Sequence, residues 1–394
     1  MQILFLTLTP IHLNPGHLAR LISLLPDLSK RHDVTIVCLN KCADRTETQR
    51  KFPKVNFIHY KLNTKGWHLE NKEKSIKEIV KIAENIAPDI CILQMEAWEL
   101  VRELNQALKG TIKFATAINA MPFLVSPIHP TGNYDNDVKK YLNSDIEKFR
   151  KEYVLEHYKE AHEVFKSLNI IAVNKTVAYL LKSYFNNLRL WQYIPLTNII
   201  KNKIAKREQR LKHDFVYMAR IESGKGVEYL ERILSLISKI MGRSVSIVVL
   251  GRMDDQKSKH ALASLINNQS RGDYLVEYKG WVDNNVKNEI LPNSGVFLYP
   301  SHYDNFPAVV NEALAYGLPV VTWDVPFSQV NYGDVNSVKI VKLLDYLEFA
   351  KVAVESYENR DRHIKESLNF IRSAANPKEM IESDINIYRE IIEN

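Results

Sequence analysis

The sequence contains no long hydrophobic run. None of its 394 residues belongs to a stretch of about eighteen consecutive apolar residues, so a membrane-spanning helix is not expected. The opening MQILFLTLTP lacks the basic start and small-residue cleavage site of a signal peptide, and is more typical of a buried strand. We therefore expect a cytoplasmic protein whose contact with a membrane, if it has one, is peripheral and at the inner face.

Cysteine and two cofactor motifs are also sparse or missing. The three cysteines, Cys38, Cys42 and Cys91, have no CxxC or metal-ligand spacing, which argues against a disulfide framework and fits a reducing compartment. No GxGxxG follows an expected strand, so nicotinamide binding is not predicted. The Asp-Asn-Asp at 135–137 follows the turn-like HPTGNY rather than a buried strand, so we interpret it as a loop or helix cap and expect no metal site.

The charge balance is basic but carries no nucleic-acid signature. Lysine and arginine number 53 against 46 acidic residues, which gives a net charge of +7. The two signs are interleaved along most of the chain, and no recognised nucleic-acid-binding motif occurs. A surplus of this size fits an anionic small ligand or a membrane surface, and we expect no nucleic-acid partner.

The length and the hydrophobic pattern indicate two domains. A chain of 394 residues exceeds what one core usually serves. Apolar, β-branched runs alternate with segments of helical period, which is typical of parallel βαβ units. The alternation breaks at the charged run 201–212 and then restarts. We predict an α/β protein with two doubly wound Rossmann-like domains in tandem and a cleft between them, at 1–200 and 201–375, with helix 376–394 as an optional completion of the first.

One segment of the first half, 138–168, has a helical period and a charged opposite face. One interpretation is a long helix that covers the sheet. The other is a basic face that rests on anionic lipid, which would fit a peripheral membrane contact.

Open α/β sheets bind ligands beyond the carboxyl ends of their strands, and ARIESGKG lies at such an end. It places Arg220 and Lys225 beside Gly224 and Gly226 at the start of a helix. Outward-pointing amides, a positive helix dipole and two cations make an anion pocket plausible. The alternative is a solvated loop with ordinary surface charges.

The stretch YDNFPAVVNEALAYGLPVV is the second such place. Asp304 precedes an expected helix, for which Pro307 suits the first turn, and Glu312 lies about a turn and a half inside. Glu312 can accept both hydroxyls of a ribose, while amides near Asn305 and Phe306 can bind phosphate. The alternative is that Asp304 caps the helix and Glu312 pairs with a lysine.

The third loop, TPIHLNPGHLARL, follows the first strand. Gly16 permits close backbone approach to a ligand, and His12 and His17 are nearby proton or phosphate partners. Each histidine is equally interpretable as a structural or exposed loop residue.

Taken together, these motifs resemble the retaining family 4 glycosyltransferases of the GT-B fold. The spacing Arg220, four residues, Lys225-Gly226 is that of the family, with alanine at 219 where the family has glycine. The second motif matches at Pro300, Ser301, Phe306, Glu312, Ala313, Gly317, Pro319, Val320 and Val321. The resemblance extends over about 215–322 and is weaker in the first half.

The resemblance implies a metal-independent transfer of sugar from a nucleotide-diphosphate donor, which is a substrate rather than a cofactor. Arg220 and Lys225 would neutralise the departing diphosphate and Asp304 would bind donor-sugar hydroxyls, so these three are the expected catalytic residues. The expected nucleotide-binding residues are Glu312, Asn305, Phe306, Ala308, Gly16 and Gly251. The acceptor would be a glycan, a lipid-linked molecule or another small molecule.

The sequence also departs from the family pattern. Asp304 stands where the family has glutamate, which shortens the reach of the side chain by about 1.5 Å. Asn305 replaces a glycine, Asn119 stands about where many members have a histidine, and PLTNI at 195–199 replaces Pro-Asn-Gly-Val. Two alternatives to a transferase therefore stay open: a catalytically silent nucleotide-sugar-binding protein, and a GT-B-type sugar-nucleotide epimerase.

Overall fold

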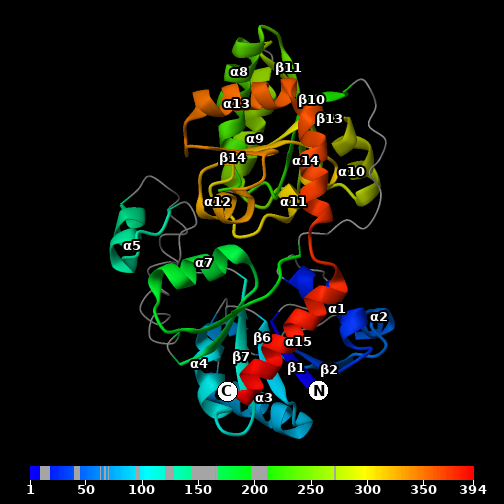
Figure 1. Ribbon diagram of the computed structural model, residues 1–394, viewed down its shortest axis with the longest axis vertical. Helices are drawn as coiled ribbons and strands as arrows, with labels where there is room; N and C mark the ends of the chain where they lie inside the picture. Colours follow the sequence, from blue (N-terminus) through cyan, green and yellow to red (C-terminus); the bar gives the residue numbers. More distant parts are fainter. Residues whose placement is uncertain are drawn as a thin grey trace.

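The chain forms two lobes, each built around a parallel β-sheet (Figure 1). The architecture comes from a computed structural model. It describes residues 1–8, 18–39, 45–62, 64–65, 68–69, 71–94, 98–119, 128–143, 165, 167–196, 211–222, 224–269 and 272–394.

The sheet of the first lobe has seven parallel strands in the order β3-β2-β1-β6-β7-β8-β9. Its strands are β1 (Gln2–Thr7), β2 (Asp33–Cys38), β3 (Asn56–His59), β6 (Ile90–Gln94), β7 (Lys113–Ile118), β8 (Asn169–Ala172) and β9 (Arg189–Gln192). A separate antiparallel pair joins β4 (Thr64–Lys65) to β5 (His68–Leu69). The helices are α1 (Ala19–Leu28), α2 (Arg45–Lys51), α3 (Lys72–Ile86), α4 (Trp98–Ala107), α5 (Tyr134–Leu142) and α7 (Lys175–Tyr184).

The sheet of the second lobe has six parallel strands in the order β12-β11-β10-β13-β14-β15. They are β10 (His213–Met218), β11 (Val245–Leu250), β12 (Tyr274–Gly280), β13 (Ser294–Tyr299), β14 (Val320–Trp323) and β15 (Val338–Val341). The helices are α8 (Val227–Met241), α9 (Gln256–Asn268), α10 (Asn284–Ile290), the short η4 (Leu291–Asn293), α11 (Ala308–Ala315), α12 (Pro326–Tyr332), α13 (Tyr346–Glu358) and α14 (Arg360–Arg372).

The central strands of both sheets are covered on both faces, which explains why they are apolar without alternation, whereas the edge strand β12 alternates exposed residues with buried or partly buried ones. Every residue of β6 and β13 is buried, as is expected of parallel strands between two helical layers. In the first lobe, one cluster packs α3, α4 and α7 on one face of the sheet, and another packs α1 and α15 (Pro377–Glu393) on the other.

The last helix returns to the first lobe after the chain has built the second (Figure 1). Its Asp384 forms a bidentate ion pair with Arg20 of α1, with both N···O distances 2.7 Å and both side chains buried. Burial opposes the charged form of Arg20, but the field of Asp384 outweighs it and raises the pKa of Arg20 above its ordinary value. Helix α15, near the C-terminal end of the sequence, therefore packs on the sheet of the first lobe.

The predicted class, two doubly wound α/β units in tandem, is confirmed by these sheets. The predicted division near residue 200 stays a prediction, because 197–210 lies outside the described residues. Most of the amphipathic segment 138–168 also lies outside them. Of that segment, α5 includes only the first residues and ends at Leu142.

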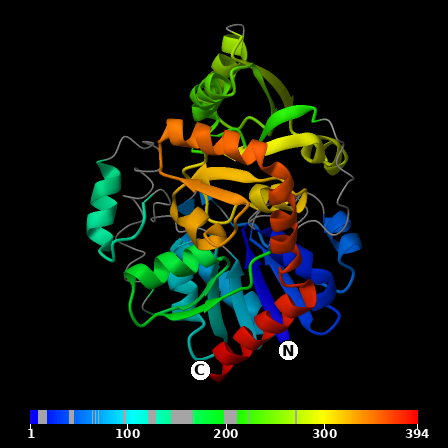
Figure 2. The same cartoon turned by 45° about the horizontal axis from the view of Figure 1, so that its top comes forward.

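The two lobes meet through the start of α7 in the first and the loop before α11 together with α12 in the second. Figure 2 shows the lobes stacked, with α7 below α12 as in Figure 1. A second contact joins His129 Nε2 to Asp324 Oδ1 over 3.0 Å.

Candidate functional site

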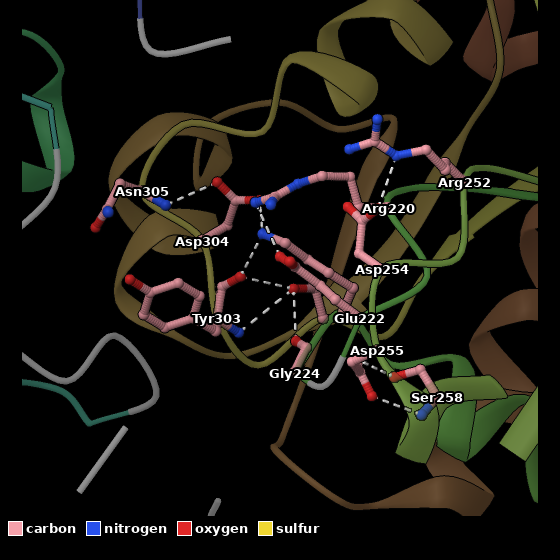
Figure 3. Close-up of polar contacts among 12 residues, drawn as sticks. Arg220, Glu222, Gly224, Arg252, Asp254, Asp255, Ser258, Tyr303, Asp304 and Asn305 are labelled. Carbon is pink, nitrogen blue, oxygen red and sulfur yellow. Dashed lines mark hydrogen bonds and ion pairs between the residues drawn. The ribbon is translucent and has the colours of Figure 1, made fainter. Parts of the chain in front are cut away.

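The site lies at the carboxyl ends of β10 and β13, the two central strands at which the order of the second sheet reverses. Such a switch point is the usual ligand-binding position of an open α/β sheet. Arg220 follows β10 and Asp304 follows β13. Figure 3 shows Arg220 and Asp304 extending toward one another from these two strand ends.

A buried ion pair forms the centre of the site. Lys225 Nζ lies 2.7 Å from Asp304 Oδ2, and the two side chains are 9% and 16% exposed. Lys225 Nζ also donates to the carbonyl oxygen of Tyr303 over 2.8 Å. The alternative of an ordinary solvated charge is therefore wrong for Lys225.

Asp304 accepts three further hydrogen bonds. Tyr299 donates its hydroxyl to Oδ2 over 2.6 Å, and the backbone N–H groups of Asn305 and Phe306 donate to Oδ1 over 2.8 and 3.2 Å. Burial by itself would raise the pKa of Asp304, but Lys225 and these donors outweigh it and hold that pKa below its ordinary value. Burial and the charge of Asp304 raise the pKa of Tyr299 well above its ordinary value, so Tyr299 keeps its proton.

The loop that carries Lys225 is fastened to the end of β13 by glycine backbone. A Cβ on Gly226, whose φ is 92°, would lie 2.1 Å from the carbonyl oxygen of Pro300, so only glycine fits there. Ser301 Oγ donates to the carbonyl oxygen of Gly224 over 3.0 Å. The spacing of cation and glycine in the sequence thus reflects a close packing of two loops.

Arg220 is the accessible cation of the site. Its side chain is 61% exposed and its Nη2 lies 2.9 Å from Oε1 of Glu222, which is itself largely buried. Since the guanidinium is exposed on one side, it can contact a ligand while Glu222 orients it.

A cavity of 310 Å³ lies between the two lobes and includes these groups in its walls. The second lobe contributes Arg220, Lys225, Tyr303, Asp304, Asn305, Phe306 and Ala308, and the first contributes Ala19, Arg20, Asn119, Val173, Asn174 and Leu196. The structure therefore brings six of the nine predicted site residues to one cavity: Arg220, Lys225, Asp304, Asn305, Phe306 and Ala308.

The first lobe also fixes the loop after β13 directly. Thr176, in the first turn of α7, donates its hydroxyl to the carbonyl oxygen of Asn305 over 2.6 Å. Asn331 of α12 donates to Thr176 Oγ1 over 2.9 Å. The N-cap of α7 is Asn174, whose side chain accepts from Val177 N over 2.9 Å and also lines the cavity.

Glu312 lies on α11 but does not line the cavity. Its Oε2 is 2.7 Å from Nζ of Lys287 on α10, and the two side chains are 15% and 20% exposed. Glu312 thus pairs with a lysine, as the alternative interpretation of the sequence predicted. Asp304 does not cap α11, because the N-cap position is Pro307 and the helix begins at Ala308, so Pro307 precedes the first turn in which we expected it.

Gly251, one of the two predicted ligand glycines, does not line the cavity. Gly251 has a φ of 147°, and a Cβ there would lie 1.7 Å from the carbonyl oxygen of Ala219, so close packing of β10 and β11 accounts for this glycine. Gly16, with His12 and His17, lies outside the described residues.

The Asp-Asn-Asp pattern belongs to a helix start. Asp135 and Asp137 lie in the first turn of α5, whose N-cap is Asn133. Asp137 accepts hydrogen bonds from Thr131 and from the hydroxyl of Tyr184. Within the described ranges, no group of three or more His, Cys, Asp or Glu residues is arranged to hold a metal ion.

Sequence reasoning missed Arg20, Thr176, Tyr299 and Lys287. The only sequence signal for Arg20 is a charged residue within the apolar run HLARLISLL, and its partner Asp384 is 364 residues away. Thr176 directly follows an Asn-Lys pair after a buried strand, which indicates a helix cap rather than a contact between lobes.

Residues 212–359, in the second lobe, match the family model described as glycosyl transferases group 1. The chain is 25% identical over 262 residues to an uncharacterized 41.2 kDa protein in the cps region of Klebsiella pneumoniae, covering 60% of this chain and 68% of that protein.

Solved structures are similar to this protein over the whole chain, and two of them serve as examples. The first is a glycosyltransferase from Rickettsia africae, with a TM-score of 0.70 at 16% identity, covering 100% of this chain and 99% of that one. The second is the Anabaena protein HepE in complex with UDP, with a TM-score of 0.64 at 14% identity and the same coverage of 100% and 99%.

These likenesses establish that the chain has the GT-B architecture of two parallel-sheet α/β domains. The match of residues 212–359 to the group 1 family model supports a glycosyltransferase as the class of enzyme. No helix in the described part of the chain is both long enough and apolar enough to span a bilayer.

Proposed function

We propose that this protein is a metal-independent retaining glycosyltransferase that transfers a sugar from a nucleotide-diphosphate donor to an acceptor bound between the lobes. The observation that carries the proposal is the cavity, in which Arg220 and Lys225 of the second lobe face Arg20 and Asn119 of the first. Two cations beside a helix start suit a diphosphate, and the opposite wall is left for an acceptor.

The chemistry follows from the charge that develops on the leaving group. As the bond from sugar to phosphate breaks, negative charge grows on the diphosphate oxygens. Lys225 and Arg220 stabilise that charge in a partly enclosed site, where such an interaction is stronger than in water. Because these two cations can neutralise the diphosphate as a divalent metal ion would, we propose that transfer does not require a metal ion.

The nucleoside would extend from the diphosphate toward α10 and α11. In this proposal, Glu312 accepts hydrogen bonds from the ribose hydroxyls. These bonds replace its present ion pair with Lys287. The retaining outcome and membership of family 4 rest on the motif spacing alone. A glycan or lipid-linked acceptor, and with it a peripheral membrane contact, rests on the basic net charge of +7.

A donor screen tests the proposal. The full-length protein is incubated with a panel of uridine, guanosine and adenosine diphosphate sugars, with and without EDTA, and released nucleoside diphosphate is measured. We expect one donor to be hydrolysed slowly without acceptor and faster with its acceptor, in the presence of EDTA. Transfer that survives in both Lys225→Ala and Glu312→Ala would contradict the assigned site.

A silent nucleotide-sugar-binding protein is the second candidate, and one observation favours it. The carboxylate of Asp304, which the family motif would use on the donor sugar, is engaged with four protein donors. Donor binding in calorimetry without release of nucleoside diphosphate would support this alternative. Conversion of the donor sugar without any acceptor would instead indicate an epimerase.

A further inference from the structure

The carboxylate of Asp304 is saturated by the protein itself. A carboxylate offers about four lone-pair directions for hydrogen bonds. Oδ2 accepts from Lys225 Nζ and the Tyr299 hydroxyl, and Oδ1 accepts from the backbone N–H groups of Asn305 and Phe306. A sugar hydroxyl could bind Asp304 only by displacing one of these donors.

Three of those donors are the groups that a diphosphate would need. They are the ammonium of Lys225 and two consecutive backbone N–H groups just before α11. Asp304 and these groups line the same 310 Å³ cavity, so the carboxylate stands where a bound phosphate would compete for the same partners.

The surroundings hold Asp304 in this position. The hydroxyl of Tyr299 comes from the buried β13, and the carbonyl oxygen of Asn305 is held by Thr176 of the first lobe over 2.6 Å. The contact of Asp304 with the next two N–H groups also suits its short side chain, because one more methylene would displace the carboxylate by about 1.5 Å.

We propose that Asp304 is the internal counter-ion of the donor site: it holds Lys225 and the amides of Asn305 and Phe306, and a donor diphosphate competes with it for these groups. This inference rests on the proposed donor site and sharpens it. Asp304 is then a positioning residue that sets the affinity for the diphosphate, not a residue that grips the transferred sugar.

The two roles predict opposite results for one substitution. Asp304→Asn keeps the shape of the side chain and its Oδ1 acceptor but removes the charge that competes with the ligand. If Asp304 is a counter-ion, diphosphates bind more tightly to the variant, because Lys225 has lost its anionic partner. If Asp304 grips the sugar and does not compete with the phosphates, a ligand without sugar keeps its wild-type affinity and only the nucleotide-sugar binds less tightly.

Isothermal titration of the full-length protein with inorganic pyrophosphate separates these outcomes. For Asp304→Asn we expect an affinity at least about tenfold above that of the wild type, which is the effect of one partly screened charge at close range. Asp254→Asn is the matched control: it removes a carboxylate that pairs with Arg252 in the same lobe and does not line the cavity, and the affinity should stay within about twofold of the wild type.

A second variant keeps the inference testable if Asp304→Asn does not fold. Tyr299→Phe removes one donor to Asp304 without changing the charge, and we expect pyrophosphate to bind about two- to threefold more tightly, since Asp304 is held less firmly. Unchanged or weaker pyrophosphate binding in the folded variants would overturn the inference.

Pyrophosphate carries neither base nor sugar, so this result does not depend on turnover. If the wild type transfers no sugar, and the Asp304→Asn variant nevertheless binds pyrophosphate more tightly than the wild type, the proposed transferase is refuted. The role of Asp304 as a counter-ion is then supported.

Discussion

The hydroxyl of Thr176 in the first lobe donates to the carbonyl oxygen of Asn305 in the second over 2.6 Å. Thr176 is fully buried, and Asn331 donates to the same hydroxyl over 2.9 Å. Asn305 is the neighbour of Asp304, so a residue of the first lobe fixes the loop that forms the donor side of the cavity. The relative position of the two lobes is thereby coupled to the geometry of the site.

We expect Thr176→Val to weaken both stability and the site. Valine keeps the volume but leaves the Asn305 carbonyl without its hydroxyl donor, at a cost of about 1–3 kcal/mol in the free energy of unfolding. Turnover should fall more than donor affinity, because the hydrogen bond that fixes the position of one lobe relative to the other is lost. Urea denaturation and steady-state kinetics measure the two effects. Thr176→Ser keeps the hydroxyl and should restore turnover; if it does not, the hydrogen bond is not the cause.

Lys225→Met tests the central cation. It removes a positive charge at the leaving group, so turnover should fall by about 100-fold or more. It also leaves Asp304 buried without its partner, and breaking such a pair costs about 3 kcal/mol or more of stability. The double variant Lys225→Met with Asp304→Asn should recover part of the stability but none of the turnover. Equal stability of the single and double variants would argue against an energetic coupling between Lys225 and Asp304.

Glu312→Gln tests the ribose site. We expect the wild type to bind the ribonucleoside diphosphate more tightly than its 2′-deoxy analogue by about tenfold, since hydrogen bonds to charged groups contribute about 1.5–3 kcal/mol. The ratio should approach one in the variant. Lys287→Met, which removes the present partner of Glu312 from 2.7 Å, should keep the preference for ribose. Titration calorimetry measures both ratios, and an unchanged ratio in Glu312→Gln would place the ribose elsewhere.

The lowered pKa of Asp304 predicts a loss of stability in acid. Burial acts against the lowering, but Lys225 and the hydrogen-bond donors prevail. Because the folded pKa lies below the unfolded one, the contribution is complete at neutral pH, starts to decline below about pH 4 and is lost as the pH falls through the folded pKa. Urea titrations from neutral to acid pH should show a smaller decline in this window for Asp304→Asn than for the wild type. Parallel curves would contradict the assigned shift.

Asp384 of α15 is expected to contribute to the stability of the first lobe, because α15 packs there and Asp384 pairs with Arg20. Asp384→Ala leaves the guanidinium of Arg20 buried without its bidentate partner, and we expect a loss of about 3–5 kcal/mol in the free energy of unfolding. Glu382→Ala changes a half-exposed side chain of the same helix and should cost no more than about 0.5 kcal/mol. Equal losses for the two variants would mean that the helix, and not the ion pair, is the origin of the effect.

The fold was largely predictable from local pattern. The strands around β1, β6, β10 and β13 are continuous apolar runs, and parallel strands with helices on both faces need such runs. The order of the strands was not predictable in detail, because apolar runs of similar length do not encode which neighbour they pair with.

The candidate site was predictable in part. Arg220, Lys225 and Asp304 follow strands whose ends meet at one edge of the sheet, so spacing alone placed them together. Gly251 shows the limit of this reasoning: a glycine after a strand can serve a ligand or, as here, a close backbone contact, and the sequence is the same in both cases.

The sequence by itself determined that the chain forms two parallel-sheet units with cations and carboxylates at the carboxyl end of the second. Local periodicity and spacing carry that information. Only the tertiary structure decided what each charge contacts: Lys225 is paired with Asp304, Glu312 with Lys287, and Arg20 with Asp384. Those partners lie 79, 25 and 364 residues apart, and a contact that folding alone creates leaves no local pattern in the chain.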